Sequence, residues 1–165
     1  MKFDGFGKVT AERISEMEGK YNISLPAEYR EFLLNNNGGV APRVSRATIF
    51  LQPISEEIDI EIMFGFGLED CFDIDYWMCQ YQDELPPRSL LIGSDTIKGF
   101  IVLNQTDSGY RVYYWGDERN FKASTDESNA YLSANDFSEF FRMINGLEEG
   151  RETKGDLAWP QFMRS

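Results

Sequence analysis

The chain has 165 residues, a length typical of one domain, and its content of 42% hydrophobic and 15% aromatic residues argues against intrinsic disorder. A formal net charge of −12 at pH 7 argues against nucleic acid as a ligand and against an anionic membrane surface, because both require a basic protein surface. The chain has no histidine, which excludes histidine-dependent nucleophiles, histidine general bases and histidine metal ligands.

The N-terminal segment and the two cysteines indicate the cellular compartment. Residues 1–15, MKFDGFGKVTAERIS, hold no apolar signal-peptide core, and no apolar run approaches the roughly 20 residues of a membrane span. Cys71 and Cys79 are eight residues apart, which fits no common metal spacing and predicts two reduced thiols. We therefore predict a cytoplasmic protein without a metal or a cofactor.

Two helices are predicted before the first strand. In residues 9–22, Thr10 is a plausible N-cap, and one face carries apolar residues at spacings of three and four. In residues 24–39, Pro26 suits the first helical position, because its missing N–H has no helical partner there. The predicted buried residues of the two helices are Ile14, Met17 and Tyr21, then Tyr29, Phe32 and Leu33. The stretch that ends the second helix is Asn35, Asn36, Asn37, Gly38 and Gly39.

The middle of the chain is predicted to be mainly strands. Residues 46–52 and 59–67 are rich in β-branched and aromatic residues. From the residue before the second region onward, apolar residues alternate at Ile58, Ile60, Ile62 and Phe64. Residues 69–84 are predicted to form a third helix. Three further strands, separated by short polar breaks that suit hairpins, are predicted at residues 89–95, 97–105 and 110–117.

The C-terminal part is predicted to hold a loop, a helix and a tail. Residues 118–131 are expected to form an exposed loop. In the predicted helix of residues 136–150, Asp136 and Glu139 resemble a capping box. The apolar face of that helix is Phe137, Phe140, Phe141 and Ile144. In the tail, residues 150–165, the side chains expected to pack back onto the domain are Trp159 and Phe162.

This order of elements predicts the fold class. Helices, then mostly antiparallel strands with one inserted helix, then a helix are typical of an α+β protein. We expect one domain over residues 1–165, in which a central, mostly antiparallel sheet is flanked by N-terminal and C-terminal helices.

Three segments resemble the SUKH superfamily. They are LPAEYREFLLNNNGG at residues 25–39, IGSDTIKGFIVLNQTDSGYRVYYWGDE at residues 92–118, and NDFSEFFRMI at residues 135–144. The resemblance places the motif-bearing core at about residues 10–149. It implies an α+β fold with a largely antiparallel sheet. The same motifs also have a structural account, in which Gly93 and Gly99 are turn or close-approach positions and Trp115 packs at a strand end.

The resemblance also implies a function, but no catalytic residues. Many bacterial members are immunity proteins that bind and neutralise toxin domains, often nucleases or deaminases, of polymorphic toxin systems. A fungal branch contains regulators of cell-wall glucan synthesis that act as interaction hubs. The superfamily is not known for a catalytic constellation, so we expect a protein that is not an enzyme. Function is expected in the parts that vary around the shared fold.

An unusual run of acidic residues is the candidate variable surface. Between Arg46 and Arg88 the sequence holds no basic residue but ten acidic ones. They are Glu56, Glu57, Asp59, Glu61, Glu69, Asp70, Asp73, Asp75, Asp83 and Glu84. The run could be a catalytic carboxylate pair at Asp73 and Asp75, although residues two apart on a helix point to different sides. It could also be a weak calcium site at Glu69, Asp70 and Asp73, a solvated face, or a partner-binding surface.

The partner-binding interpretation names five residues. On a helix over residues 69–84, one side would present Asp70, Asp73, Trp77, Gln80 and Glu84. The core-facing side would hold Phe72, Tyr76 and Cys79, with Ile74 and Met78 beside them. Carboxylates around a tryptophan suit a partner rich in arginine. We therefore predict a non-catalytic immunity protein whose partner is a basic, nuclease-type toxin domain. The alternative is a regulatory protein-interaction module. The oligomeric state is left open.

Overall fold

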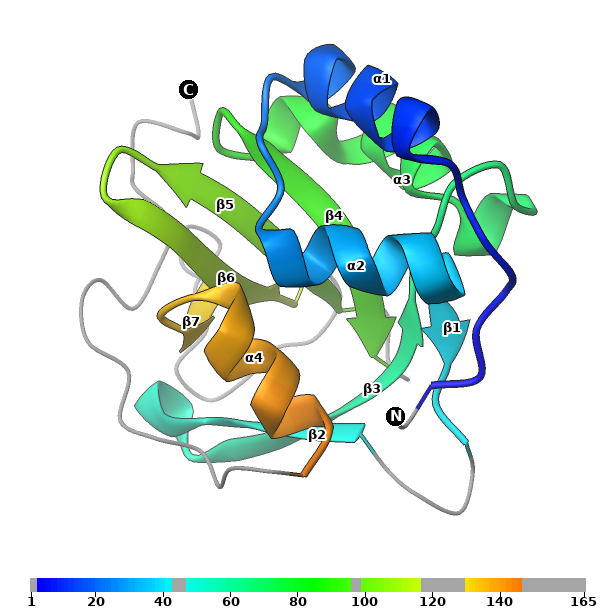
Figure 1. Cartoon of the computed structure of the whole chain (residues 1–165). Coiled ribbons are helices and arrows are strands. Elements are labelled where there is room, and N and C mark those ends of the chain that lie inside the picture. The colour runs from blue at the N-terminus through cyan, green and yellow to red at the C-terminus, as the bar shows by residue number, and fades with distance from the viewer. Residues whose placement is uncertain (1–2, 43–46, 96–98, 117–129, 147–165) are drawn as a thin grey trace.

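The computed structural model describes residues 3–42, 47–95, 99–116 and 130–146 (Figure 1). Within these residues, four α-helices and one seven-stranded antiparallel sheet form a single α+β domain, which confirms the predicted fold class. The helices are α1 (Ala11–Tyr21), α2 (Ala27–Asn36), α3 (Ile74–Tyr81) and α4 (Phe137–Ile144). The strands are β1 (Gly39–Val40), β2 (Ala47–Leu51), β3 (Glu56–Met63), β4 (Ser89–Asp95), β5 (Phe100–Thr106), β6 (Gly109–Trp115) and β7 (Ala130–Ala134).

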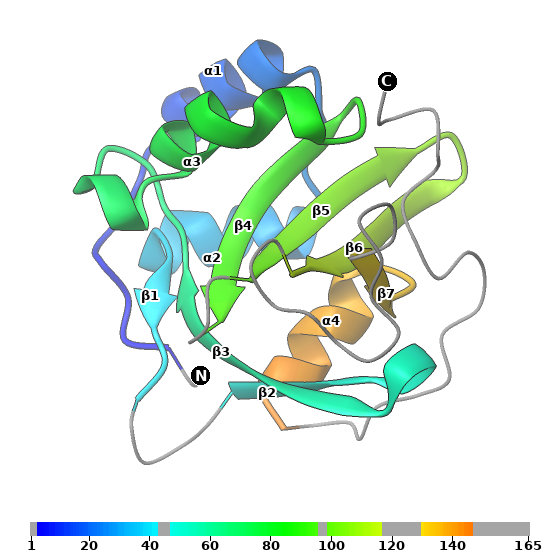
Figure 2. The ribbon, with the colours of Figure 1, turned by 180° about the vertical axis from the view of Figure 1, so that it is seen from behind.

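The sheet runs in the order β1-β3-β4-β5-β6-β7, and β2 pairs with β3 outside this path. β3 pairs with β2 over its first half and with β1 over its last residues. Helices α2 and α4 lie together on one side of the sheet, and α1 and α3 lie side by side at one end of the molecule (Figures 1 and 2). The candidate segment on α3 is therefore positioned by contacts with α1 and with β4.

The two N-terminal helices form where predicted. The Thr10 side chain accepts a hydrogen bond from the Arg13 N–H at 3.1 Å and so caps α1. All six residues of the predicted buried faces are buried: Ile14, Met17, Tyr21, Tyr29, Phe32 and Leu33. Pro26 is the N-cap of α2 and not its first helical residue, one position from the prediction. Its backbone is extended there, so Ala27 begins the helix.

The asparagine and glycine stretch after α2 has a specific structural role. Asn37 has φ 47° and ends α2 in the left-handed region. Its side-chain amide accepts from the Phe66 N–H at 2.8 Å and donates to the Phe66 carbonyl at 3.0 Å. Gly38 follows at φ 83°, where a Cβ would lie 2.4 Å from the Met63 carbonyl oxygen. The stretch therefore joins the end of α2 closely to the chain after β3.

The alternation predicted at residues 58–64 is interrupted at Ile62. Ile58, Ile60 and Phe64 are buried as predicted, but Ile62 is only partly buried. The pairing of β3 with β4 shifts register between Ile60 and Ile62. A bulge at this point turns Met63 inward, which strict alternation does not predict.

The third predicted helix is interrupted. Residues 70–72 form a 3-10 turn, α3 covers only Ile74–Tyr81, and a second 3-10 turn follows at Gln82–Glu84. Asp73 between them has φ −99° and ψ 125°, which is extended backbone. Gly65 fixes this break, because its N–H donates to the Phe72 carbonyl at 2.9 Å and its carbonyl accepts from the Ile74 N–H at 2.8 Å. A pairing with a residue distant in sequence therefore replaces helix at Asp73.

The three predicted central strands are present, and the packing roles of their marked residues are confirmed. Trp115 ends β6, is 2% exposed and packs against Phe100 at a ring-centroid distance of 5.9 Å. A Cβ on Gly99 would lie 2.0 Å from the Tyr114 hydroxyl, so a close approach requires glycine there. Gly93 is a close-approach position of the same kind.

The C-terminal part differs more from the predictions. The expected loop of residues 118–131 overlaps β7 at Ala130 and Tyr131, and its other residues lie outside the described ones. The short strand AYLSA lacks the β-branched residues that predict strands and is held by its pairing with β6. The tail of residues 150–165 also lies outside the described part of the chain.

Helix α4 forms with the predicted cap. Asp136 accepts from the Glu139 N–H at 2.8 Å, and the Glu139 carboxylate accepts from the Asn135 N–H at 2.8 Å. The reciprocal bond of the capping box thus goes to the residue before the N-cap. The predicted apolar face packs inward, with Phe141 only partly buried. Its other members, Phe137, Phe140 and Ile144, are fully buried.

Candidate partner-binding surface

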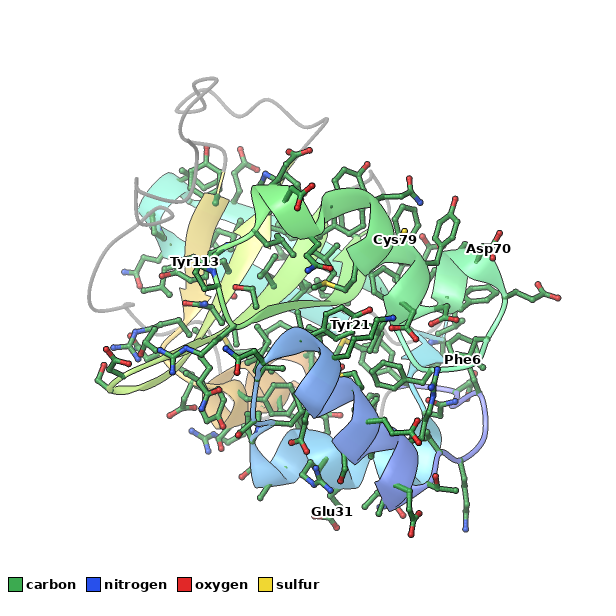
Figure 3. All side chains as sticks on the ribbon, turned by 90° about the horizontal axis from the view of Figure 1, so that it is seen from above. Phe6, Tyr21, Glu31, Asp70, Cys79 and Tyr113 are labelled. Atoms are coloured by element: carbon green, nitrogen blue, oxygen red, sulfur yellow. The ribbon has the colours of Figure 1, made fainter. Side chains whose placement is uncertain are left out.

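The acidic segment of residues 69–84 contains two kinds of carboxylate. Glu69 and Asp70 before α3 are exposed, as are Asp83 and Glu84 after it. Asp73 and Asp75, at the start of α3, are partly buried. Figure 3 shows Asp70 at the periphery of the molecule and Tyr21 between α1 and α3. The exposed carboxylates therefore lie at the two ends of α3, and the enclosed ones lie toward α1.

Asp75 is fully engaged by α1. Its carboxylate pairs with the Arg13 guanidinium at 3.2 Å and with the Lys20 ammonium at 3.2 Å, and it accepts a hydrogen bond from the Tyr21 hydroxyl. Burial, followed by the hydrogen bond to Asp75, raises the pKa of Tyr21 well above its ordinary range. The absence of basic residues along the sequence therefore does not hold in space, because α1 supplies two cations to this carboxylate.

Asp73 serves the start of the helix. Its Oδ1 accepts from the Asp75 N–H at 3.0 Å, which makes it the N-cap of α3. Burial raises the pKa of the Asp73 carboxyl, and the charge of Asp75 adds to the rise. Hydrogen bonds from the backbone at Asp75 and Leu68 act in the opposite direction. With Asp75 paired to α1 and Asp73 capping α3, both carboxylates of the considered catalytic pair have structural roles.

Trp77 is partly buried and firmly held. Its indole N–H donates to the Cys71 carbonyl at 3.1 Å. Its rings pack against Phe64 at 5.9 Å and Phe100 at 5.2 Å between centroids. Trp77 is therefore a rigid support at the margin of the core, and only part of it is available to a partner.

The predicted faces of α3 are rotated relative to the structure. Ile74 and Met78 are buried as predicted, but Tyr76 and Cys79 are exposed where a core position was expected. Phe72 is partly buried and packs against Phe6 at 4.9 Å. The core side is centred on Ile74 and Met78, and a helical projection from these two residues alone places Tyr76 opposite them. The spacing of Ile74 and Met78 therefore indicates an exposed Tyr76, although its aromatic character favours a core position.

The five proposed contact residues do not form one stripe. Gln80 and Glu84 are exposed, on α3 and on the 3-10 turn that follows. Asp70 is exposed but lies before the break at Asp73, so it is not on the same helix. Asp73 and Trp77 are partly buried. The structure thus presents Asp70 and Glu84 at opposite ends of α3, with Gln80 between them.

A metal site is not supported by the described residues. No group of three or more histidine, cysteine, aspartate or glutamate side chains among them is placed to hold a metal ion. The calcium site considered at Glu69, Asp70 and Asp73 therefore has no geometric support. Cys71 and Cys79 are free thiols.

Comparison with known proteins identifies the family. The model described as SMI1 / KNR4 family (SUKH-1) matches residues 8–143, which include all four helices except the last residue of α4. The chain belongs to this family. Neither a curated protein nor a solved structure matches it. Proteins of the SUKH-1 family are generally non-catalytic, and membership is consistent with immunity or regulatory roles.

This SUKH-1 chain also has a cavity beside the acidic segment. Its volume is about 410 Å³, and it lies between the end of α1 and the turn that leads into β4. Met78, Leu85 and Pro86 supply apolar lining, and Lys20, Asp83 and Arg88 bring charges of both signs. A partner that docks on the C-terminal end of α3 would meet this mixed surface beside Glu84.

No described helix is both long and apolar enough to cross a membrane.

Proposed function

We propose that this SUKH-1 protein is a non-catalytic immunity protein that binds and neutralises a cognate toxin domain of a polymorphic toxin system. The toxin domain is of a basic, nuclease type, and the two proteins meet in the cytoplasm of the producing cell. Family membership supports an immunity or a regulatory role, and the charge distribution favours the first.

The observation that carries the proposal is the set of exposed carboxylates at the ends of α3: Glu69, Asp70, Asp83 and Glu84. Among the described lysines and arginines, none is ion-paired with any of these four. Asp75, by contrast, is compensated by Arg13 and Lys20. Uncompensated charge therefore points outward from both ends of the helix.

A nuclease supplies the complementary surface. It must hold phosphates, so its active face carries lysine and arginine. An acidic protein with net charge −12 attracts such a face over a distance of about one Debye length, and its carboxylates can then pair with the arginines. Occupation of that face would exclude nucleic acid without any chemistry by the inhibitor.

The test is capture of the partner from the host, followed by a toxicity assay. Tagged protein is incubated with host lysate at low and at moderate salt, and retained proteins are identified by mass spectrometry. We expect one stoichiometric basic protein. When expressed alone, that protein should arrest growth, and co-expression with the wild-type chain should restore it.

Two matched variants test whether the partner contacts the charges beside α3. Asp70→Lys with Glu84→Lys reverses exposed charges beside α3. Glu31→Lys with Glu57→Lys reverses two exposed charges elsewhere, on α2 and β3, and gives the same net charge. Asp73 is left unchanged because it caps α3. We expect only the first variant to lose the partner. If both variants retain the partner equally, the ends of α3 are not its contact surface.

The regulatory alternative predicts a different outcome of the same experiment. A regulatory module would capture a protein that is not toxic when expressed alone. Salt also separates the two functions, because association steered by charge slows steeply as ionic strength rises.

A further inference from the structure

We infer that the outward face of α3, centred on Tyr76, is an arginine-binding surface. The inference rests on the proposed function and adds to it the chemistry of the partner residue: an arginine that stacks on the Tyr76 ring and pairs with a neighbouring carboxylate. Tyr76 was not among the contact residues predicted from the sequence, and its exposure is a finding of the structure.

Tyr76 lies in the middle of a polar stripe. Asp73, Tyr76, Gln80 and Asp83 follow one another at spacings of three, four and three residues, which places them along one side of the helix and its continuation. Tyr76 is 38% exposed. Among the described residues, Phe50 and Tyr76 are the two large hydrophobic side chains that are exposed. Its position opposite the buried Ile74 and Met78 leaves it pointing to solvent.

The ring of Tyr76 is supported but not covered. It meets Trp77 at a centroid distance of 5.1 Å and an interplanar angle of 80°. An edge-to-face contact of this kind uses at most one face of the tyrosine ring. Trp77 is itself fixed by its hydrogen bond to the Cys71 carbonyl and by Phe64. The Tyr76 ring therefore packs on a tryptophan that is already held in place. This lowers the entropic cost when an arginine stacks on the ring.

Within the described residues, no cation occupies this ring. A cation–π contact among these residues joins Lys20 to Tyr21, and both lie on α1. Arg13 and Lys20, two cations of α1, are held by Asp75 on the side facing α1. Tyr76 is exposed, and the exposed carboxylates Asp70 and Asp83 lie before and after it along the chain. An incoming cation is therefore directed to Tyr76 and not to Asp75.

This arrangement favours arginine over lysine. A guanidinium can lie flat on an aromatic ring while its edge N–H groups donate to a carboxylate. An ammonium is a compact, strongly hydrated charge that gives up more hydration when it contacts a ring. Charge attraction alone treats the two alike, so a preference for arginine reports the aromatic contact.

The test compares two capped peptides of equal charge, acetyl-Gly-Arg-Gly-Arg-Gly-amide and acetyl-Gly-Lys-Gly-Lys-Gly-amide. Their Kd values for the full-length chain are measured by NMR titration at low salt, with the Trp77 indole N–H as one reporter. We expect the arginine peptide to bind roughly two- to five-fold more tightly, the size of a cation–π contact at an exposed site.

The variants separate the ring from the charges. Tyr76→Leu should bring the arginine-to-lysine ratio to about one, whereas Tyr76→Phe should keep it, because the aromatic face remains. Phe50→Leu is the matched control: Phe50 is also 38% exposed but lies on β2, and its loss should leave the ratio unchanged. Unfolding midpoints of all variants check that each is folded.

The outcomes distinguish this inference from the proposed function. Equal binding of the two peptides by the wild-type chain, a ratio that survives Tyr76→Leu, or no binding of the arginine peptide at millimolar concentration overturns the role of Tyr76. The lysine peptide reports the charges alone. If Asp70→Lys with Glu84→Lys leaves its affinity unchanged, the acidic contact surface of the proposed function fails, whatever the ratio is.

Discussion

Asp75 on α3 accepts a hydrogen bond from the hydroxyl of Tyr21 on α1, and the two residues are 54 positions apart in the sequence. Two cations of α1, Arg13 and Lys20, complete the contact. The contact lies on the side of α3 that faces α1, whereas Tyr76 is exposed opposite the buried Ile74 and Met78. The structural ion-pair network therefore faces away from the candidate surface.

Asp75→Asn is expected to destabilise the fold modestly. The substitution keeps the shape of the side chain but removes the charge that attracts Arg13 and Lys20. Both cations are largely exposed, so most of the loss comes from the hydrogen bond of Tyr21, which becomes a weaker bond to a neutral amide oxygen. We expect a loss of about 1–2 kcal/mol in urea unfolding. Glu16→Gln, which breaks only the exposed pair of Arg13 and Glu16, should cost within about 0.5 kcal/mol. Equal losses in the two variants would contradict this assignment.

Asp73→Asn is expected to change how stability depends on pH. Burial raises the pKa of Asp73, so the folded protein binds this proton more tightly than the unfolded chain. That contribution is fully present below the ordinary aspartate pKa of about 4 and is lost as pH rises through the higher folded value. Asparagine is an equally good N-cap and carries no charge. The variant should therefore gain more stability, relative to wild type, at pH 7 than at pH 3.

Unfolding curves at these two pH values measure the difference directly. Asp136→Asn is the matched control, since Asp136 caps α4 and its side chain accepts a backbone N–H in the same way. If Asp73→Asn increases stability by the same amount at both pH values, the increase does not come from removal of a buried charge.

Asn37→Ala is expected to be one of the more damaging polar substitutions. It removes both hydrogen bonds to the backbone of Phe66 and leaves two buried groups without partners, which costs about 2–4 kcal/mol. Asn22→Ala is the control, because Asn22 also ends a helix at positive φ, 52°, and is exposed. It should lose only the conformational preference, about 1 kcal/mol. Chemical denaturation of both variants tests whether the bond to Phe66 or the backbone conformation matters more.

The sequence predicts elements whose signals are local. Helices α1, α2 and α4 follow from apolar spacing together with Thr10, Asn37 and Asp136 at their ends. The central strands follow from β-branched runs between polar turns. In each case the residues that decide the element lie within it or next to it, so a single stretch of sequence is sufficient.

Features fixed by distant contacts could not be predicted in the same way. The break at Asp73 depends on Gly65, and the compensation of Asp75 depends on Arg13, 62 residues away. The short strand β7 is held by β6 and has a weak intrinsic preference for a strand. The exposed face of α3 is different, because the spacing of Ile74 and Met78 already indicates that Tyr76 faces solvent. Contacts with α1 and β4 then hold α3 in this rotation.

The most direct test of the central claim is the association rate between the captured partner and the purified chain as a function of ionic strength. We predict that the wild-type rate falls steeply between low and moderate salt. Asp70→Lys with Glu84→Lys should associate at least several-fold more slowly at low salt, and Glu31→Lys with Glu57→Lys should associate at close to the wild-type rate. Equal rates for the two variants, or a wild-type rate insensitive to salt, would contradict the claim that the exposed carboxylates beside α3 guide a basic partner to this surface.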